Sequence, residues 1–248
     1  MVYRHRPRFI GIAQGSGIWG ETHPLHVKVF PVKCRVLMMN LAKQDPPMQE
    51  AKRSALAHSF EEDGFAIARG FFSQETVAEI CRRAEKILDQ RTEFSPTYTN
   101  ITKGLEKADG FFAQLLNAGP QVSLLQELLG TRPIPATASF FTKNTTAEEV
   151  YPHIDSVYGG VIWVALDDTN RDNGCIHFLR GSHRRQAEFS YLKPNQANDL
   201  SDHPDLIEAS MNAGDMVLFQ STTVHWSGPN HNGTPRRGFN CFYTGKSE

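Results

Sequence analysis

His153 and Asp155 stand two positions apart in the stretch "YPHID", and an imidazole and a carboxylate at this spacing can bind one metal ion. Side chains alternate between the two faces of an extended segment, so these two are expected to point the same way. The spacing alone is weak evidence, because His203 and Asp205 repeat it around Pro204. That second pair falls in a polar loop, and we interpret it as solvated surface.

His225 is the candidate for a third ligand, since it follows a short apolar strand and precedes a Gly-Pro turn. Taken singly, a histidine in such a place is more often a partly buried structural residue, which is our interpretation of His177 and His183. Two imidazoles and one carboxylate on one face of an ion leave three positions open. This is the ligand set of non-haem Fe(II) oxygenases. The three residues together therefore predict a metal site of that type.

The first half of the chain is expected to be largely helical. Residues 49–64 predict a helix that ends at Gly64, with Ala55, Leu56 and Phe60 on its apolar side. A short strand over 65–72 and a strongly amphipathic helix capped by Ser73 are expected next. Residues 108–130 predict one or two further helices.

The second half has a different pattern, with short segments rich in β-branched and aromatic residues between turn sequences. The predicted strands cover residues 134–143, 159–168, 174–180, 215–221 and 235–244. Helices followed by many short strands predict an α+β fold, in which an antiparallel sandwich or jelly roll has helices packed outside one sheet. No phosphate-binding glycine motif and no internal repeat is present in the sequence.

Composition sets limits on the partners. The 248 residues carry a formal net charge of −1, which gives no reason to expect nucleic acid or an anionic membrane surface as a partner. No apolar run approaches the length of a membrane span. The four cysteines are widely spaced, which is typical of free thiols in a reducing compartment.

Residues 1–38 differ from the rest, because they hold six arginines and lysines against a single acid, Glu21. We interpret them as a poorly ordered extension, as a transit segment or as the product of an early start codon, and residues 39–248 as one domain. The expected location is cytoplasmic, or mitochondrial if residues 1–38 are a true transit segment.

Several motifs occur together from residue 134 onward. The stretch "YPHID … IWVALDDTNRDNGCIHFLRGSHR … NAGDMVLFQSTTVHWSGPNHNGTPRRGFNCFY" resembles the phytanoyl-CoA dioxygenase (PhyH) family of Fe(II)/2-oxoglutarate oxygenases. The resemblance extends over roughly residues 55–245. It implies a double-stranded β-helix, Fe(II) as the metal, 2-oxoglutarate as co-substrate and O₂ as oxidant.

The resemblance also assigns roles. His153, Asp155 and His225 match the iron ligands, which makes them the predicted catalytic centre. Arg236, eleven residues after His225, matches the cation that binds the distal carboxylate of 2-oxoglutarate, a task for which a planar, permanently charged guanidinium is suited. Two further co-substrate contacts are expected: the hydroxyl of Ser227, and Trp163 as a wall of the pocket, although plain core packing explains Trp163 equally well. Ile154 stands where the family often has Gln, but this side chain is expected to point away from the metal.

By this resemblance the protein hydroxylates an unactivated carbon of a small molecule and releases succinate and CO₂. Desaturation or ring rearrangement with the same cofactors is one alternative, and a cupin-type metal or binding protein without 2-oxoglutarate is another. Asp155 argues against halogenation, because halogenating relatives have a small residue at that place. Arg180, Arg184, Arg185 and Lys193 could meet an anionic substrate, but a solvated loop explains them better. We expect a monomer or homodimer.

Overall fold

The computed structural model describes residues 48–88, 101–145, 149–156, 158–193 and 196–245, and the predicted extension over residues 1–38 lies outside them. The described helices are α2 (Glu50–Asp63), α3 (Gln74–Leu88), α4 (Leu105–Ala108), α5 (Gly110–Ala118) and α6 (Pro120–Leu129). The described strands are β1 (Phe65–Ala68), β2 (Ile101–Lys103), β3 (Ile134–Lys143), β4 (Val150–His153), β5 (Gly159–Ala165), β6 (Ile176–Leu179), β7 (Leu206–Ala209), β8 (Met216–Gln220), β9 (His225–Ser227) and β10 (Arg236–Thr244).

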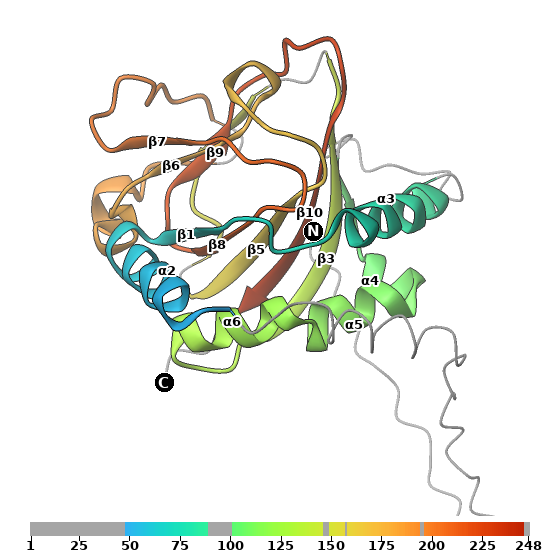
Figure 1. The fold of residues 1–248 in the computed structure, drawn as a ribbon. Helices are drawn as coiled ribbons and strands as arrows, with labels where there is room; N and C mark the ends of the chain where they lie inside the picture. The colour runs from blue at the N-terminus through green and yellow to red at the C-terminus, as the bar shows by residue number, and fades with distance from the viewer. Residues whose placement is uncertain (1–47, 89–100, 146–148, 157, 194–195, 246–248) are drawn as a thin grey trace, which may run out of the picture.

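The described strands form two antiparallel sheets that face each other. The larger has the order β1-β8-β5-β10-β3-β2, and the smaller has the order β4-β9-β6-β7. The helices lie along the outer face of the larger sheet, with α6, α5 and α4 beneath it and α3 at its side (Figure 1). This arrangement confirms the prediction of an α+β jelly roll with helices packed outside one sheet.

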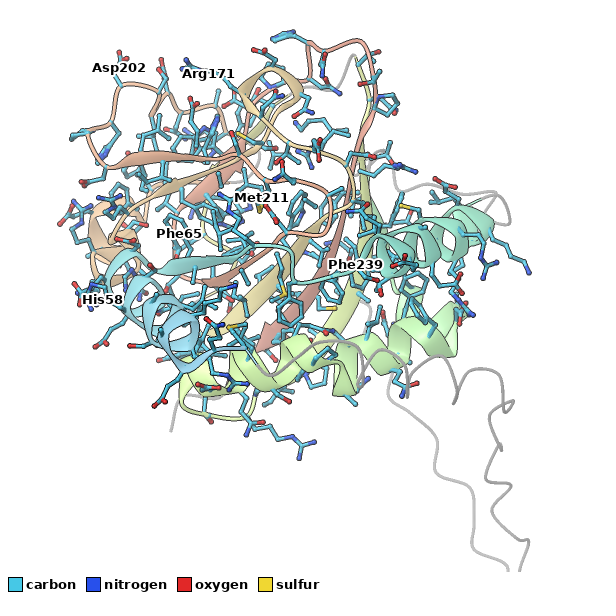
Figure 2. The ribbon with its side chains drawn as sticks, in the orientation of Figure 1. His58, Phe65, Arg171, Asp202, Met211 and Phe239 are labelled. Carbon is cyan, nitrogen blue, oxygen red and sulfur yellow. The ribbon has the colours of Figure 1, made fainter. Side chains whose placement is uncertain are left out.

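Strand alternation divides the core between the two faces of the larger sheet. On β5, Ile162 and Val164 pack with the helices, whereas Val161, Trp163 and Ala165 face the space between the sheets. Phe178 of β6 joins this inner cluster from the smaller sheet. In Figure 2, Phe65 and Met211 belong to the inner cluster, and Phe239 belongs to the cluster beneath the helices. A functional site between the sheets is thus reached by every second residue of each strand.

Some predicted elements need correction. In α2 only Phe60 is buried, and Ala55 is exposed, so the apolar side of this helix is narrower than predicted. The strand predicted over 65–72 ends at Ala68, because Gly70 turns the chain with a φ of +60°. The strands β2, β7 and β9, of three or four residues each, were not predicted. Within the described residues, no helix has the length and apolar character needed to cross a membrane.

Asp215 joins the start of β8 to the end of β1. Its carboxylate accepts hydrogen bonds from Arg69 Nη1 at 2.7 Å, from the backbone N–H of Gly70 at 2.7 Å and from that of Asn212 at 2.9 Å. Burial acts to raise the pKa of Asp215, but these three donors outweigh burial, and the pKa is lowered. The carboxylate therefore stabilises the fold above the ordinary pKa of about 3.9, and this contribution is lost as the pH falls through the lower folded value.

We expect Asp215→Ala to destabilise the protein by about 3 kcal/mol at pH 7, because three donors lose a charged acceptor. For a chain of this size, such a loss lowers Tm by roughly 6–12 °C. The difference in stability between wild type and variant should shrink below pH 4, because the Asp215 carboxylate of the unfolded chain becomes protonated there, and that of the folded protein follows at lower pH. Thermal unfolding at pH 7 and pH 3 measures both effects. Asp202→Ala, at an exposed carboxylate, is the control, and equal Tm values for the two variants would contradict the assignment.

Candidate metal centre

The pairing of β4 with β9 places two histidines side by side. His153 and His225 are Cα partners in this ladder, and the centroids of their imidazole rings lie 4.4 Å apart. Asp155 follows the end of β4, where its backbone N–H donates to the carbonyl of Ser221 at 2.9 Å. The first two residues of the predicted ligand set thus come from one edge strand and its end, and the third comes from the neighbouring strand.

Backbone hydrogen bonds orient both imidazoles. Nδ1 of His153 lies 2.7 Å from the carbonyl of Tyr151, and Nδ1 of His225 lies 3.0 Å from the carbonyl of Thr223. A carbonyl can only accept, so Nδ1 carries a proton in each ring, and in the neutral ring Nε2 keeps its lone pair. Nε2 is the atom that each ring directs toward Asp155.

The ligand atoms converge. The Nε2 atom of His153 lies 3.6 Å from one carboxylate oxygen of Asp155, and the Nε2 atom of His225 lies 3.6 Å from the other. All three ligand atoms lie within 4.8 Å of one another. Nitrogen and oxygen ligands stand about 2.0–2.2 Å from a first-row metal ion, so two of them on one ion are at most about 4.4 Å apart. Both histidine–carboxylate distances meet that limit.

Burial and mutual charge shift the pKa values of the three residues. Burial lowers the pKa of His225 to about 4, with the neighbouring His153 acting in the same direction. Burial also acts to lower the pKa of His153, but the hydrogen bond and charge of Asp155 outweigh it, and this pKa is raised. For Asp155, burial acts to raise the pKa, and the two histidines lower it overall. The carboxylate is therefore ionised near neutral pH, as a metal ligand must be.

Arg236 is a buried cation that pairs with no acid in the part of the chain that the structure describes. It is 4% exposed, and its Nη2 donates to the carbonyl of Gly174, while its Nε has no hydrogen-bond partner among the described residues. No aspartate or glutamate within the described ranges forms an ion pair with it, and burial lowers its pKa to about 10. Buried charges are normally paired, so the arrangement fits a site for an external anion.

Trp163 lies close to this cation, and Ser227 lies on the facing sheet. Ser227 follows His225 by two residues in β9 and shares its face, and its buried hydroxyl forms no hydrogen bond with the described residues. The indole of Trp163 lies 5.3 Å from the guanidinium carbon of Arg236. Trp163 and Arg236 are thus neighbours, and Ser227 is expected to face the same space from the smaller sheet.

Gly238 makes room for that indole. A Cβ atom on Gly238 would lie 2.2 Å from Cζ2 of Trp163, a distance at which the indole must move. We expect Gly238→Ala to cost about 1–3 kcal/mol of stability, as overpacking does. It should also weaken binding of an anion at Arg236, because the indole packs against that guanidinium. Thermal unfolding and anion titration measure the two effects.

Gly228→Ala is the matched control, since its Cβ would meet nothing closer than 3.7 Å. If Gly238→Ala and Gly228→Ala had the same Tm and the same anion affinity, the close packing of Trp163 on Gly238 would be wrong.

Arg237 leaves the opposite face of β10. Its backbone N–H, Nε and Nη2 all donate to the carboxylate of Asp167, at 2.7, 3.0 and 2.7 Å, and its Nη1 donates to Glu85 of α3 at 2.8 Å. The alternation along a strand predicts this separation of the two arginines. Arg237 fixes the backbone at Arg236 and ties the sheet to α3.

The other candidate residues have structural surroundings. His203 and Asp205 do not form a metal cluster in the described part of the chain: Asp205 instead accepts from Arg185 at 2.7 Å. His183 is buried, and its Nε2 lies 3.0 Å from the carbonyl of Glu61, while His177 packs edge-on against Trp226.

The basic loop after β6 is largely neutralised by acids. Arg180 pairs with Asp63 at 3.2 Å, and Arg184 pairs with Glu62 at 3.1 Å. Both acids lie at the end of α2, so these arginines fasten that helix to the loop. An anionic substrate would have to displace these acids from both arginines.

Two features of the site were not predicted. Gly174, the first residue of the strand predicted over 174–180, adopts a φ of +75° and directs its carbonyl to Arg236. Lys143, at the end of β3, is 6% exposed and is the Cα partner of Arg236. Burial, followed by the charge of Arg236, lowers its pKa to about 7. A lysine that ends a predicted strand was the available signal, but such a residue is usually exposed.

Comparison with known proteins agrees with this geometry. The family model described as phytanoyl-CoA dioxygenase (PhyH) matches residues 60–238. Phytanoyl-CoA dioxygenase domain-containing protein 1 of Mus musculus is 24% identical over 250 residues, covering 73% of this chain and 86% of the mouse protein.

Two solved structures are similar to the chain. AviO1 from Streptomyces viridochromogenes Tue57 is 25% identical with a TM-score of 0.64, covering 79% of this chain and 96% of AviO1. The epimerase SnoN, in complex with Fe³⁺, alpha-ketoglutarate and nogalamycin RO, is 20% identical with a TM-score of 0.65, covering 79% of this chain and 84% of SnoN. Both similarities extend over most of the described residues.

Proposed function

On the premise that the chain belongs to the phytanoyl-CoA dioxygenase family of iron- and 2-oxoglutarate-dependent oxygenases, we propose that it hydroxylates an unactivated carbon of a small-molecule substrate. One observation supports this most: the inward-facing His153, Asp155 and His225 share the space between the sheets with Arg236, a buried cation without an acid partner in the described ranges. The chemistry of these residues fits both a divalent metal and a dicarboxylate.

We assign Fe(II) to the Nε2 atoms of His153 and His225 and to the carboxylate of Asp155. When bound, this metal supplies the redox chemistry that couples O₂ and the decarboxylation of 2-oxoglutarate to substrate oxidation, with release of succinate and CO₂. The chain fixes the ligand geometry. The carbonyls of Tyr151 and Thr223 hold both imidazoles in the tautomer that presents Nε2.

We assign the distal carboxylate of 2-oxoglutarate to Arg236 and the hydroxyl of Ser227. A guanidinium offers parallel N–H donors to a carboxylate, and Gly174 occupies only one of its nitrogens. Trp163 forms the wall beside them and excludes water from the ion pair. In a dry site such a pair is stronger than in solvent.

Two alternatives remain distinct from hydroxylation. Desaturation and ring rearrangement would use the same metal and co-substrate, and the similar fold of an epimerase fits such outcomes. Asp155 argues against halogenation, which needs a small residue in its place. A cupin-type protein without 2-oxoglutarate would have no use for Arg236 in its buried position.

The proposal is tested by aerobic assay of the Fe(II)-loaded protein with 2-oxoglutarate and a panel of small acids, amino acids and acyl-thioesters. We expect at least one compound to stimulate succinate release, and the product to gain one oxygen atom from ¹⁸O₂. Removing the metal with a chelator should stop turnover. A product that is two hydrogen atoms lighter than the substrate and contains no ¹⁸O would show that the reaction is desaturation and would contradict hydroxylation.

A further inference from the structure

Two polar residues face the space between the sheets outside the proposed metal and carboxylate sites. Asn240 of β10 is the Cα partner of Ser139 on β3 and of Trp163 on β5. Phe239 and Cys241, its chain neighbours, pack beneath the helices, so Asn240 points the other way. On β2, Lys103 is the Cα partner of Ser139. A polar row therefore runs across the inner face from the sheet edge to Trp163.

Neither Asn240 nor Ser139 finds a partner for its side chain in the described part of the protein. The Oδ1 atom of Asn240 is buried without a hydrogen bond. Ser139 is 2% exposed, and no hydrogen bond joins its hydroxyl to any described residue. Polar groups in a protein interior are normally satisfied, and the exceptions are often found where a ligand binds. On the neighbouring strand β5, Val161 and Trp163 of the inner cluster face the same side of the sheet.

The row is separate from the proposed co-substrate site. Gly238 lies between Arg236 and Asn240 on the same face of β10, and the indole of Trp163 fills the space over it. Arg236 is thus on one side of that indole, and Asn240 is on the other. A dicarboxylate bound at Arg236 would leave Asn240 and Ser139 facing a different ligand.

We propose that Asn240 and Ser139 recognise the primary substrate, and that this substrate is a polar small molecule with hydroxyl, amine or amide groups rather than a plain alkyl chain. The inference rests on the proposed function, since it takes the metal and co-substrate sites as given. An amide provides both a donor and an acceptor, and a hydroxyl does the same. An alkyl chain would leave the Oδ1 atom of Asn240 buried without a partner, whereas a polar substrate would satisfy it.

Stability gives the first test, and it needs no substrate. Asn240→Leu keeps the size of the side chain and removes its polarity. In the anaerobic Fe(II)·2-oxoglutarate protein, we expect Tm to stay the same or to rise, because no protein hydrogen bond is lost. Asn232→Leu, at an exposed loop position, is the matched control. A fall in Tm of more than about 4 °C for Asn240→Leu alone would make Asn240 a structural residue and overturn the proposal.

Recognition gives the second test. A panel of hydroxylated, amino and amide compounds is compared with acyl-thioesters and hydrocarbons for stimulation of succinate release. We expect at least one compound of the polar set to stimulate succinate release. For that compound, KM should rise at least tenfold in Asn240→Leu and in Ser139→Ala. The Kd of 2-oxoglutarate should be unchanged in both variants. Stimulation only by the apolar set, or an equal KM in the variants, would overturn the proposal.

The Kd of 2-oxoglutarate distinguishes this proposal from the proposed function. If the wild-type protein failed to bind 2-oxoglutarate at all, the proposed function would fail first. If Asn240→Leu weakened 2-oxoglutarate binding as much as Arg236→Ala does, the polar row would belong to the co-substrate site, and the assignment to the primary substrate would be wrong.

Discussion

Asp155→Ala is expected to abolish 2-oxoglutarate turnover and to reduce Fe(II) binding from one ion per chain to none at micromolar metal. Asp155 is the only carboxylate of the cluster formed by the described residues, and its two oxygens each face one histidine Nε2 at 3.6 Å. Its loss removes both a ligand and the negative charge that balances the ion. Metal content after desalting, followed by succinate release, measures the effect. His225→Ala should behave in the same way.

The repeated His-x-Asp pair provides the control. Asp205→Ala removes an acid that pairs with Arg185 on the surface, so turnover and metal content should match the wild type. Should Asp205→Ala abolish activity while Asp155→Ala retained it, the metal would have to be moved to the other pair.

Arg236→Ala is expected to weaken 2-oxoglutarate binding by about two to three orders of magnitude. Removing one side of a buried ion pair costs roughly 3–5 kcal/mol, and each 1.4 kcal/mol corresponds to a tenfold change in affinity. Ser227→Ala should have a smaller effect, since it removes one hydrogen bond to a charged group, worth about 1.5–3 kcal/mol. Calorimetric titration of 2-oxoglutarate into the anaerobic metal-loaded protein compares the two.

Arg237→Ala is the matched control, because it removes the same side chain from the adjacent position. Its guanidinium pairs with Asp167 and Glu85 on the helix side of the sheet, so the variant should lose several degrees of Tm while its 2-oxoglutarate affinity changes less than about tenfold. If Arg237→Ala weakened 2-oxoglutarate binding more than Arg236→Ala does, the assignment of Arg236 to the inner face of β10 would be wrong.

Long strands were predictable because their pattern repeats. The strand predicted over 134–143 coincides with β3, and the strand predicted over 235–244 begins one residue before β10. That register, with its period of two, places Arg236 and Arg237 on opposite faces. The amphipathic helix after Ser73 was equally clear, since its apolar residues recur at helical spacing over four turns.

Short elements and long-range pairing were not predictable to the same degree. His225 was expected just after a strand, but it begins β9, whose three residues are too few to show a period. The local sequence does not predict that His153 and His225 are partners in one ladder. The two residues are separated by 71 positions, and local patterns do not determine which strands pair. The residue types made His225 a candidate ligand, and the family resemblance supplied the match to an iron ligand.

Buried polar groups on strands were the hardest to assign. Lys143 and Asn240 look like ordinary surface residues of a half-exposed strand, and only the closed arrangement of the two sheets buries the side chain of Lys143 and the Oδ1 atom of Asn240. The arginines of the 180–185 segment posed the opposite problem. They suggested an anion site by composition, but the acids at the end of α2, far away in sequence, neutralise two of them.

The central claim is that one Fe(II) held by His153, Asp155 and His225 shares its site with one 2-oxoglutarate held by Arg236. Anaerobic titration of 2-oxoglutarate into the Fe(II)-loaded protein tests it directly through the metal-to-ligand charge-transfer absorbance of the chelate. We predict a band that saturates at one 2-oxoglutarate per chain, is lost in Asp155→Ala and needs at least a hundredfold more 2-oxoglutarate in Arg236→Ala. Tight Fe(II) binding with no band at any 2-oxoglutarate concentration would contradict the claim and favour a cupin-type metal protein.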